Sequence, residues 1–145
     1  MKKIAPAIFV VFAALWYVRD PAWLDAMTSG LRPWEQSADG HRYRWSGGHA
    51  SFFVPSSAAS FDLPLSTMFG ASDPPMVVTI TVDDRPANRL LLTDADWHVV
   101  TVTPSAPTTR RVRRVDVRAK VTRDGNYGVR IGEIALRSTS LGSAR

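Results

Sequence analysis

The feature that most constrains the fold is a two-residue period of apolar side chains from residue 43 towards the C-terminus. It is clearest in residues 76–82, where a large apolar side chain occupies every second position. Successive side chains of a β-strand point to opposite faces, so this period indicates strands with one buried face, whereas helices would show a period of 3.6. The body of the chain is therefore predicted to be all-β.

Eight segments follow this pattern, and Gly, Pro, Asp and Ser residues separate them. They are residues 42–45, 49–54, 60–66, 76–82, 88–93, 97–103, 110–121 and 129–137. About eight short strands at this spacing predict a two-sheet antiparallel β-sandwich of jelly-roll type. The sandwich domain is expected over residues 41–138, followed by a flexible tail over residues 139–145. Within residues 110–121, Val112 is out of phase with Val115, which predicts a β-bulge near Arg113.

The N-terminus has a different pattern. Lys2 and Lys3 precede residues 4–18, which are uncharged and mostly apolar, as in an export signal. The run is shorter than the roughly 17–25 residues of an ordinary spanning helix, but no convincing cleavage site follows it. We expect residues 1–19 to be a retained signal-anchor that contacts the membrane through residues 4–18. A cleaved signal and a buried helix of a cytosolic protein remain as alternatives.

This interpretation places the protein in the bacterial inner membrane as a single-pass protein, with the C-terminal domain on the extracytoplasmic side. Residues 20–40 contain Pro21, Gly30, Pro33 and Gly40 and are expected to form a linker. The apolar residues within it also allow a short amphipathic helix that lies on the membrane surface.

Several stretches resemble the small jelly-roll, galactose-binding-like domains of bacterial extracytoplasmic proteins, including those appended to membrane glycosyltransferases. The resemblance spans residues 43–137 and is carried by residues 43–50, 78–85, 96–100 and 130–134. It implies a β-sandwich with a non-catalytic role, often in carbohydrate contact. Members of this group are usually fused to an enzyme or to a many-helix membrane domain.

No catalytic motif is evident, so we expect a protein that is not an enzyme. The sequence has no cysteine, no G-x-S-x-G motif and no phosphate-binding glycine loop. His41, His49 and His98 lack the spacing of metal ligands, so neither a metal site nor a cofactor is predicted. Asp94 and Asp96 form a D-x-D pattern, which a turn before a strand explains. A structural calcium ion held by loop carboxylates remains open.

Exposed aromatic side chains stack on sugar rings, and polar neighbours bind the hydroxyl groups. Such a carbohydrate site is predicted from the residues Trp45, Trp97, Tyr127, Asp84, Asn126 and Arg130. In a small sandwich the same tryptophans can instead pack in the core.

Basic residues concentrate in the last third of a chain whose net charge is +5. A surface for an anionic partner is predicted from the residues Arg110, Arg111, Arg113, Arg114 and Arg118. A solvated strand face is the alternative. Export argues against a nucleic-acid partner. The expected function is that of a non-catalytic, membrane-anchored extracytoplasmic module that binds a cell-envelope glycan or assists a glycan-handling system. The alternative is an interaction protein that docks on a membrane protein or an anionic lipid surface through its basic strand.

Overall fold

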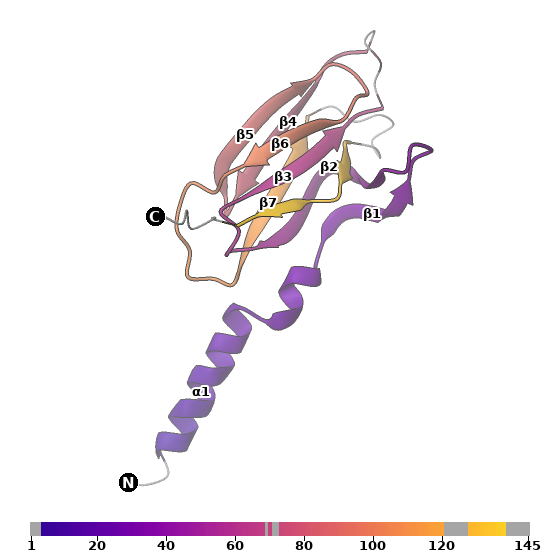
Figure 1. Ribbon diagram of the computed structural model, residues 1–145. Helices are drawn as coiled ribbons and strands as arrows, with labels where there is room; N and C mark the ends of the chain where they lie inside the picture. Colours follow the sequence, from indigo (N-terminus) through magenta and orange to yellow (C-terminus); the bar gives the residue numbers. More distant parts are fainter. Residues whose placement is uncertain (1–3, 69, 71–72, 121–127, 139–145) are drawn as a thin grey trace, which may run out of the picture.

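The computed structural model describes residues 4–68, 70, 73–120 and 128–138. Within these residues, helix α1 and a short 3₁₀ helix, η1, precede nine strands (Figure 1). The bounds are α1 Ile4–Arg19, η1 Ala22–Ala26, β1 Ser29–Gln36, β2 Arg42–Pro55, β3 Ser60–Ser66, β4 Met76–Val82, β5 Arg85–Leu92, β6 His98–Val102, β7 Val112–Ala119, β8 Arg130–Gly132 and β9 Ala135–Arg137.

The strands form one antiparallel sheet that curls over on itself. Along the sheet the order is β5-β4-β7-β2-β8-β3-β6, with β1 paired to β2 and β9 paired to β3. The long strand β2 joins the two halves, because its residues 49–55 pair with β7 and its residues 43–45 pair with β8. The segments 42–45 and 49–54, which were expected to be separate strands, are therefore parts of one continuous strand.

The core lies between the two halves of the curled sheet. Strand β4 shows how the sequence period produces it, since Met76, Val78 and Ile80 are fully buried while the residues between them are half-exposed. They pack in one cluster with Phe61, Leu63 and Leu65 of β3, and with residues of β2, β6 and β7. Burying such side chains stabilises the fold by about 1.5–3 kcal/mol each relative to leaving them exposed. The predicted all-β sandwich is confirmed.

Part of the predicted linker belongs to the sheet in the structure. Residues 20–40 contain η1 and the strand β1, which pairs with β2 from Ser29 opposite Ser51 to Gln36 opposite Arg42. Gly30 adopts a φ of +67°, and a Cβ there would lie 2.0 Å from the carbonyl oxygen of His49. The close approach of the two backbones requires glycine at this position. The sandwich therefore begins at β1, before the expected boundary at residue 41.

The predicted bulge near Arg113 is wrong. The register between β2 and β7 runs without a shift from Pro55 opposite Val112 to His49 opposite Arg118. Arg113 itself occupies the same face as Val115, where its side chain is only 10% exposed. A charged residue at a core-facing position breaks the apolar period although the strand is regular.

Helix α1 extends away from the sandwich (Figure 1). Its described side chains are exposed, among them Phe9, Phe12 and Trp16. Within the described residues, no helix has both the length and the apolar character needed to cross a membrane.

Candidate functional site

An aromatic cluster lies where β2, β8 and the segment before β6 meet. The rings of Tyr43 and Trp45 contact edge to face at 5.9 Å, and Tyr43 lies 6.2 Å from Trp97. The guanidinium of Arg130 lies over all three rings, 5.6 Å from Tyr43, 5.7 Å from Trp45 and 5.3 Å from Trp97. These cation–π contacts fix the orientation of the rings.

Arg130 is held on its other side by the loops that flank the cluster. Its Nη2 donates hydrogen bonds to the hydroxyl of Ser66 at 2.7 Å and to the carbonyl oxygens of Thr67 and Ala95 at 3.0 and 3.2 Å. Trp45 is buried, with 8% of its surface exposed, so it packs beneath the surface. Trp97, which is partly exposed, lines a cavity.

We call this cavity the Trp97 cleft. It has a volume of about 330 Å³ and is lined by Gly40, His41, Arg42, Pro64, Trp97, Val99, Gly132 and Glu133. The ring of His41 lies 5.8 Å from that of Trp97 at a tilt of 37°. Gly132 keeps the floor open, because a Cβ there would lie 3.0 Å from Pro64 and 3.5 Å from the Trp97 ring.

Charged groups at the rim of the cleft are positioned by their neighbours. Arg42 Nη1 donates to Glu133 Oε1 at 2.8 Å, and its guanidinium lies 5.2 Å from the centre of the Trp34 ring. Both partners of this ion pair are more than half exposed. The cleft therefore combines an aromatic face with groups that donate and accept hydrogen bonds, which suits a neutral polar ligand with an apolar ring face.

Burial raises the pKa of Tyr43, and the nearby carboxylate of Glu35 raises it further. The phenol therefore stays protonated and donates a hydrogen bond to Glu35 Oε2 at 3.1 Å. This bond ties β1 to the aromatic cluster.

The structure brings together three of the six predicted carbohydrate-site residues: Trp45, Trp97 and Arg130. Asp84 is not with them, because Trp97 precedes β6 whereas Asp84 shares a pocket with residues 104–108, which follow β6 at its other end. Tyr127 and Asn126 lie outside the described residues. Arg42 and Glu133 were not predicted as site residues, since only the pairing of β2 with β8 brings them together.

The arginines predicted to form one basic surface make separate contacts within the chain. Arg111 binds its own chain: its backbone N–H donates to Asp20, and its guanidinium contacts Asp25 Oδ2 at 3.0 Å and the carbonyl oxygen of Pro21 at 2.8 Å. This hydrogen bond from Arg111 lowers the pKa of Asp25. The other predicted arginines contact acids or lie elsewhere. Arg113 pairs with Asp83, Arg114 pairs with Asp84 and Asp116, and Arg118 is exposed further along β7.

A Ser–His–Asp group lies on the opposite face of β7 from the core. His49 Nε2 lies 2.9 Å from Asp116 Oδ1, and the hydroxyl of Ser51 also donates to Asp116. In a catalytic triad the histidine would accept the serine proton and contact the acid through its other ring nitrogen. Here one nitrogen, Nε2, faces both groups, with Ser51 Oγ at 3.4 Å. The arrangement satisfies a buried carboxylate and lacks the geometry of a triad.

The D-x-D pattern forms a turn. The backbone N–H of Asp96 donates to Asp94 Oδ1 at 3.0 Å, and His98 Nε2 lies 2.8 Å from the same oxygen. The hydrogen bond from His98 lowers the pKa of Asp94. In the part of the chain that the structure describes, no three His, Cys, Asp or Glu side chains gather as a metal site would require.

Neither protein-family models nor curated proteins match the sequence. Among solved structures, the chain is similar to a family two carbohydrate esterase from Cellvibrio japonicus, with a TM-score of 0.51, 14% identity and coverage of 80% of this chain. It spans only 32% of that esterase chain. It is also similar to a family 35 carbohydrate binding module from an environmental isolate, with a TM-score of 0.50, 13% identity and coverage of 76% of this chain and 88% of that one. These similarities show the fold, and they confirm the jelly-roll β-sandwich that the sequence predicted.

Proposed function

We propose that this chain is a non-catalytic glycan-binding module and that a sugar ring stacks on Trp97 in the Trp97 cleft. The observation that carries the proposal is the cleft itself: a partly exposed indole beside an ion pair that can bind hydroxyl groups. The fold is shared with a solved carbohydrate binding module, which supports this function.

The geometry of the cleft supports a neutral sugar. Arg42 and Glu133 lie side by side as an ion pair, so the rim offers one set of donors and one set of acceptors with no excess charge. The positive charge of Arg130 is directed towards the rings and the loop oxygens below the cleft. A neutral ring with several hydroxyl groups matches this combination better than an anion does.

Glycan binding is tested by screening the full chain in neutral detergent against a glycan array and soluble polysaccharides. The affinity for each hit is then measured by calorimetry for the wild type and for Trp97→Ala. Loss of a stacking ring is expected to weaken binding at least about ten-fold. Trp23→Ala is the matched control, because Trp23 is 53% exposed on η1 and lies outside the cleft.

Equal affinities for the wild type and Trp97→Ala would contradict the assignment of the cleft. An array without any hit would contradict glycan binding altogether. Glu133→Gln provides a second check that leaves the aromatic ring in place: it is expected to weaken binding by removing the acceptor charge and the ion pair with Arg42.

We further propose that α1 attaches the module to the bacterial inner membrane, with the sandwich on the extracytoplasmic side. The support is the pattern of Lys2, Lys3 and the apolar residues after them, together with the exposed side chains of α1. Fractionation of expressing cells tests this. A full-length product released from membranes only by detergent is expected, whereas a shortened product in the soluble extracytoplasmic fraction would show cleavage instead.

A further inference from the structure

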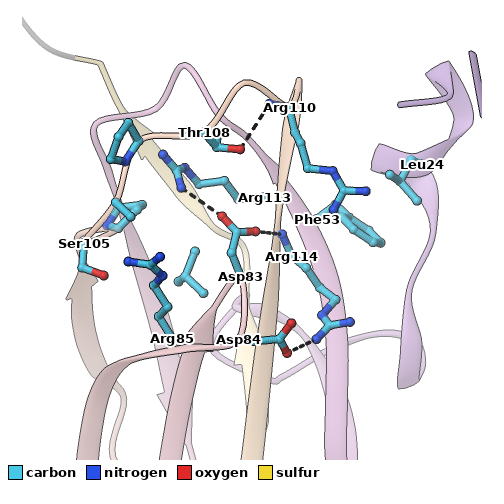
Figure 2. A pocket seen from close by; sticks show the side chains of 14 residues that line it. Leu24, Phe53, Asp83, Asp84, Arg85, Ser105, Thr108, Arg110, Arg113 and Arg114 are labelled. Carbon is cyan, nitrogen blue, oxygen red and sulfur yellow. Dashed lines mark hydrogen bonds and ion pairs between the residues drawn. The ribbon is translucent and has the colours of Figure 1, made fainter. Parts of the chain in front are cut away.

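A second cavity, which we call the arginine pocket, lies at the other end of the sandwich from the Trp97 cleft. Its volume is about 440 Å³. The β4–β5 turn, the loop over residues 104–108 and the start of β7 form its walls, and Leu24 of η1 contributes to its rim (Figure 2). Four arginines line it: Arg85, Arg110, Arg113 and Arg114.

The β4–β5 turn places an aspartate at the centre of these cations. Asp83 and Asp84 have φ angles of 50° and 65°, the left-handed conformation that both central residues of a type I′ hairpin adopt. Asp83 thereby faces β7, where it accepts a hydrogen bond from the backbone N–H of Arg114 at 3.0 Å and one from Arg113 Nη1 at 2.9 Å. Both carboxylate oxygens are occupied (Figure 2).

The two aspartates of the pocket form ion pairs with two of its arginines. Arg113 pairs with Asp83, and Arg114 pairs with Asp84 and, outside the pocket, with Asp116. Among the described residues, no carboxylate lies within ion-pair distance of Arg85, which extends from the first position of β5 into the pocket. Arg85 therefore gives the pocket a positive charge that no carboxylate of the described residues balances.

Arg113 provides an independent sign of a missing contact. Its side chain is only 10% exposed, and its Nε–H is buried without a hydrogen-bond partner among the described residues. An unpaired buried donor of this kind costs about 1–3 kcal/mol, so most such groups in folded proteins bind a partner. Arg113 lines the pocket, so an acceptor oxygen bound there would lie near this donor.

We propose that the arginine pocket binds a phosphate group through Arg85 and Arg113. Guanidinium groups bind phosphate through paired N–H donors. The cations here lie on different walls, on β5, on β7 and on the loop between β6 and β7. A tetrahedral oxyanion presents oxygens in several directions and reaches such separated donors, whereas a planar carboxylate presents two oxygens in one plane.

The phosphate can come from a soluble phosphate compound or from a lipid headgroup. The pocket lies at the end of the sandwich to which Arg111 ties the segment after α1, through Asp20 and Asp25. Helix α1, whose described apolar side chains are exposed, extends from this same end (Figure 1). A membrane that received α1 would therefore bring its headgroups towards the pocket.

Two arms of one experiment separate these sources. In the first, sodium phosphate is titrated into the full chain in neutral detergent, and binding is followed by calorimetry against sodium chloride of equal ionic strength. In the second, the chain is mixed with phosphatidylcholine vesicles with and without phosphatidylglycerol, and cosedimentation is measured. Each arm compares the wild type with Arg85→Ala and with Arg89→Ala, a matched control on the same strand whose side chain is exposed outside the pocket.

Arg85→Ala is expected to weaken phosphate binding about ten-fold or more, while Arg89→Ala leaves it unchanged. Weaker binding by Arg85→Ala in the first arm identifies a soluble phosphate ligand. Weaker binding by this variant in the second arm alone identifies the lipid headgroup. Equal behaviour of the wild type and Arg85→Ala in both arms overturns the proposal. Glycan affinity is measured on the same variants, so failure here is distinct from failure of the Trp97 cleft. Arg113→Lys removes the buried Nε–H donor and tests its role separately. Its melting temperature is measured to check that the variant folds.

Discussion

At the scale of single residues, buried charge determines several features of this protein. Asp116 is 5% exposed, and it accepts hydrogen bonds from Ser51, His49 and Arg114. Burial alone would raise the pKa of Asp116, but the hydrogen bonds and the Arg114 charge together hold it below its usual value of 3.8. The carboxylate therefore stabilises the fold in its ionised form.

The sign of the pH effect follows from this lowered pKa. A carboxyl whose pKa is lower in the folded state contributes stability above its unfolded value, and that contribution is lost as the pH falls through the folded value. The melting temperature of the wild type is expected to fall more steeply between pH 5 and pH 3 than that of Asp116→Asn. Parallel curves for the two proteins would show that Asp116 does not contribute in this way.

Gly30 gives a second prediction at this scale. Gly30→Ala must adopt a positive φ and place its Cβ 2.0 Å from the His49 carbonyl oxygen, so the β1–β2 contact has to shift. The expected loss is about 1–3 kcal/mol from the conformation alone, with more from the displaced backbone. Gly47→Ala is the control, because its Cβ would have no neighbour within 4 Å. Chemical denaturation measures both, and similar values for the two variants would refute the close approach.

At the scale of elements, β1 shows where sequence patterns stop being informative. Residues 29–36 contain Gly30 and Pro33 and no two-residue apolar period, and in the structure most of this strand is exposed. A strand that pairs along one edge and buries little side-chain surface leaves no period to detect. Strands β3 and β4 were predictable within a residue because each buries one complete face.

The guanidinium of Arg111 holds η1 by contacts with Asp25 and two carbonyl oxygens, while its backbone N–H donates to Asp20. Arg111→Ala is expected to speed hydrogen exchange in residues 20–27 while exchange in β4 and β7 stays unchanged, since the core does not depend on this contact. Arg118→Ala, an exposed arginine on β7, is the control. Unchanged exchange in residues 20–27 would show that other contacts hold η1.

At the scale of the whole molecule, the sandwich architecture was predictable while the candidate site was only partly so. Apolar alternation reports which residues face a core, and this was sufficient for the fold class. It does not report which strands pair, so it could not bring Arg42 next to Glu133 or separate Asp84 from Trp97. Trp97 and Arg130 could be predicted as site residues because their aromatic and basic side chains can be recognised from the sequence alone.

The sandwich is expected to fold without α1. The described side chains of the helix are exposed, and β1 provides the first strand of the sheet. Removal of residues 1–18 should therefore leave the melting temperature within a few degrees of the full chain, on the order of 1 kcal/mol or less. Near-ultraviolet circular dichroism checks that the aromatic cluster is retained. A large fall in melting temperature would show that α1 stabilises the sandwich.

The pairing of β1 with β2 also has a mechanical consequence. Because α1 and η1 precede β1, tension applied through the N-terminus pulls β1 along its own length. Its partner β2 belongs to both halves of the curled sheet, so the load passes through the hydrogen bonds between β1 and β2 into both halves. A module held by its N-terminus while its ligand is pulled away is thus attached through a strand that transmits the force to the whole sheet.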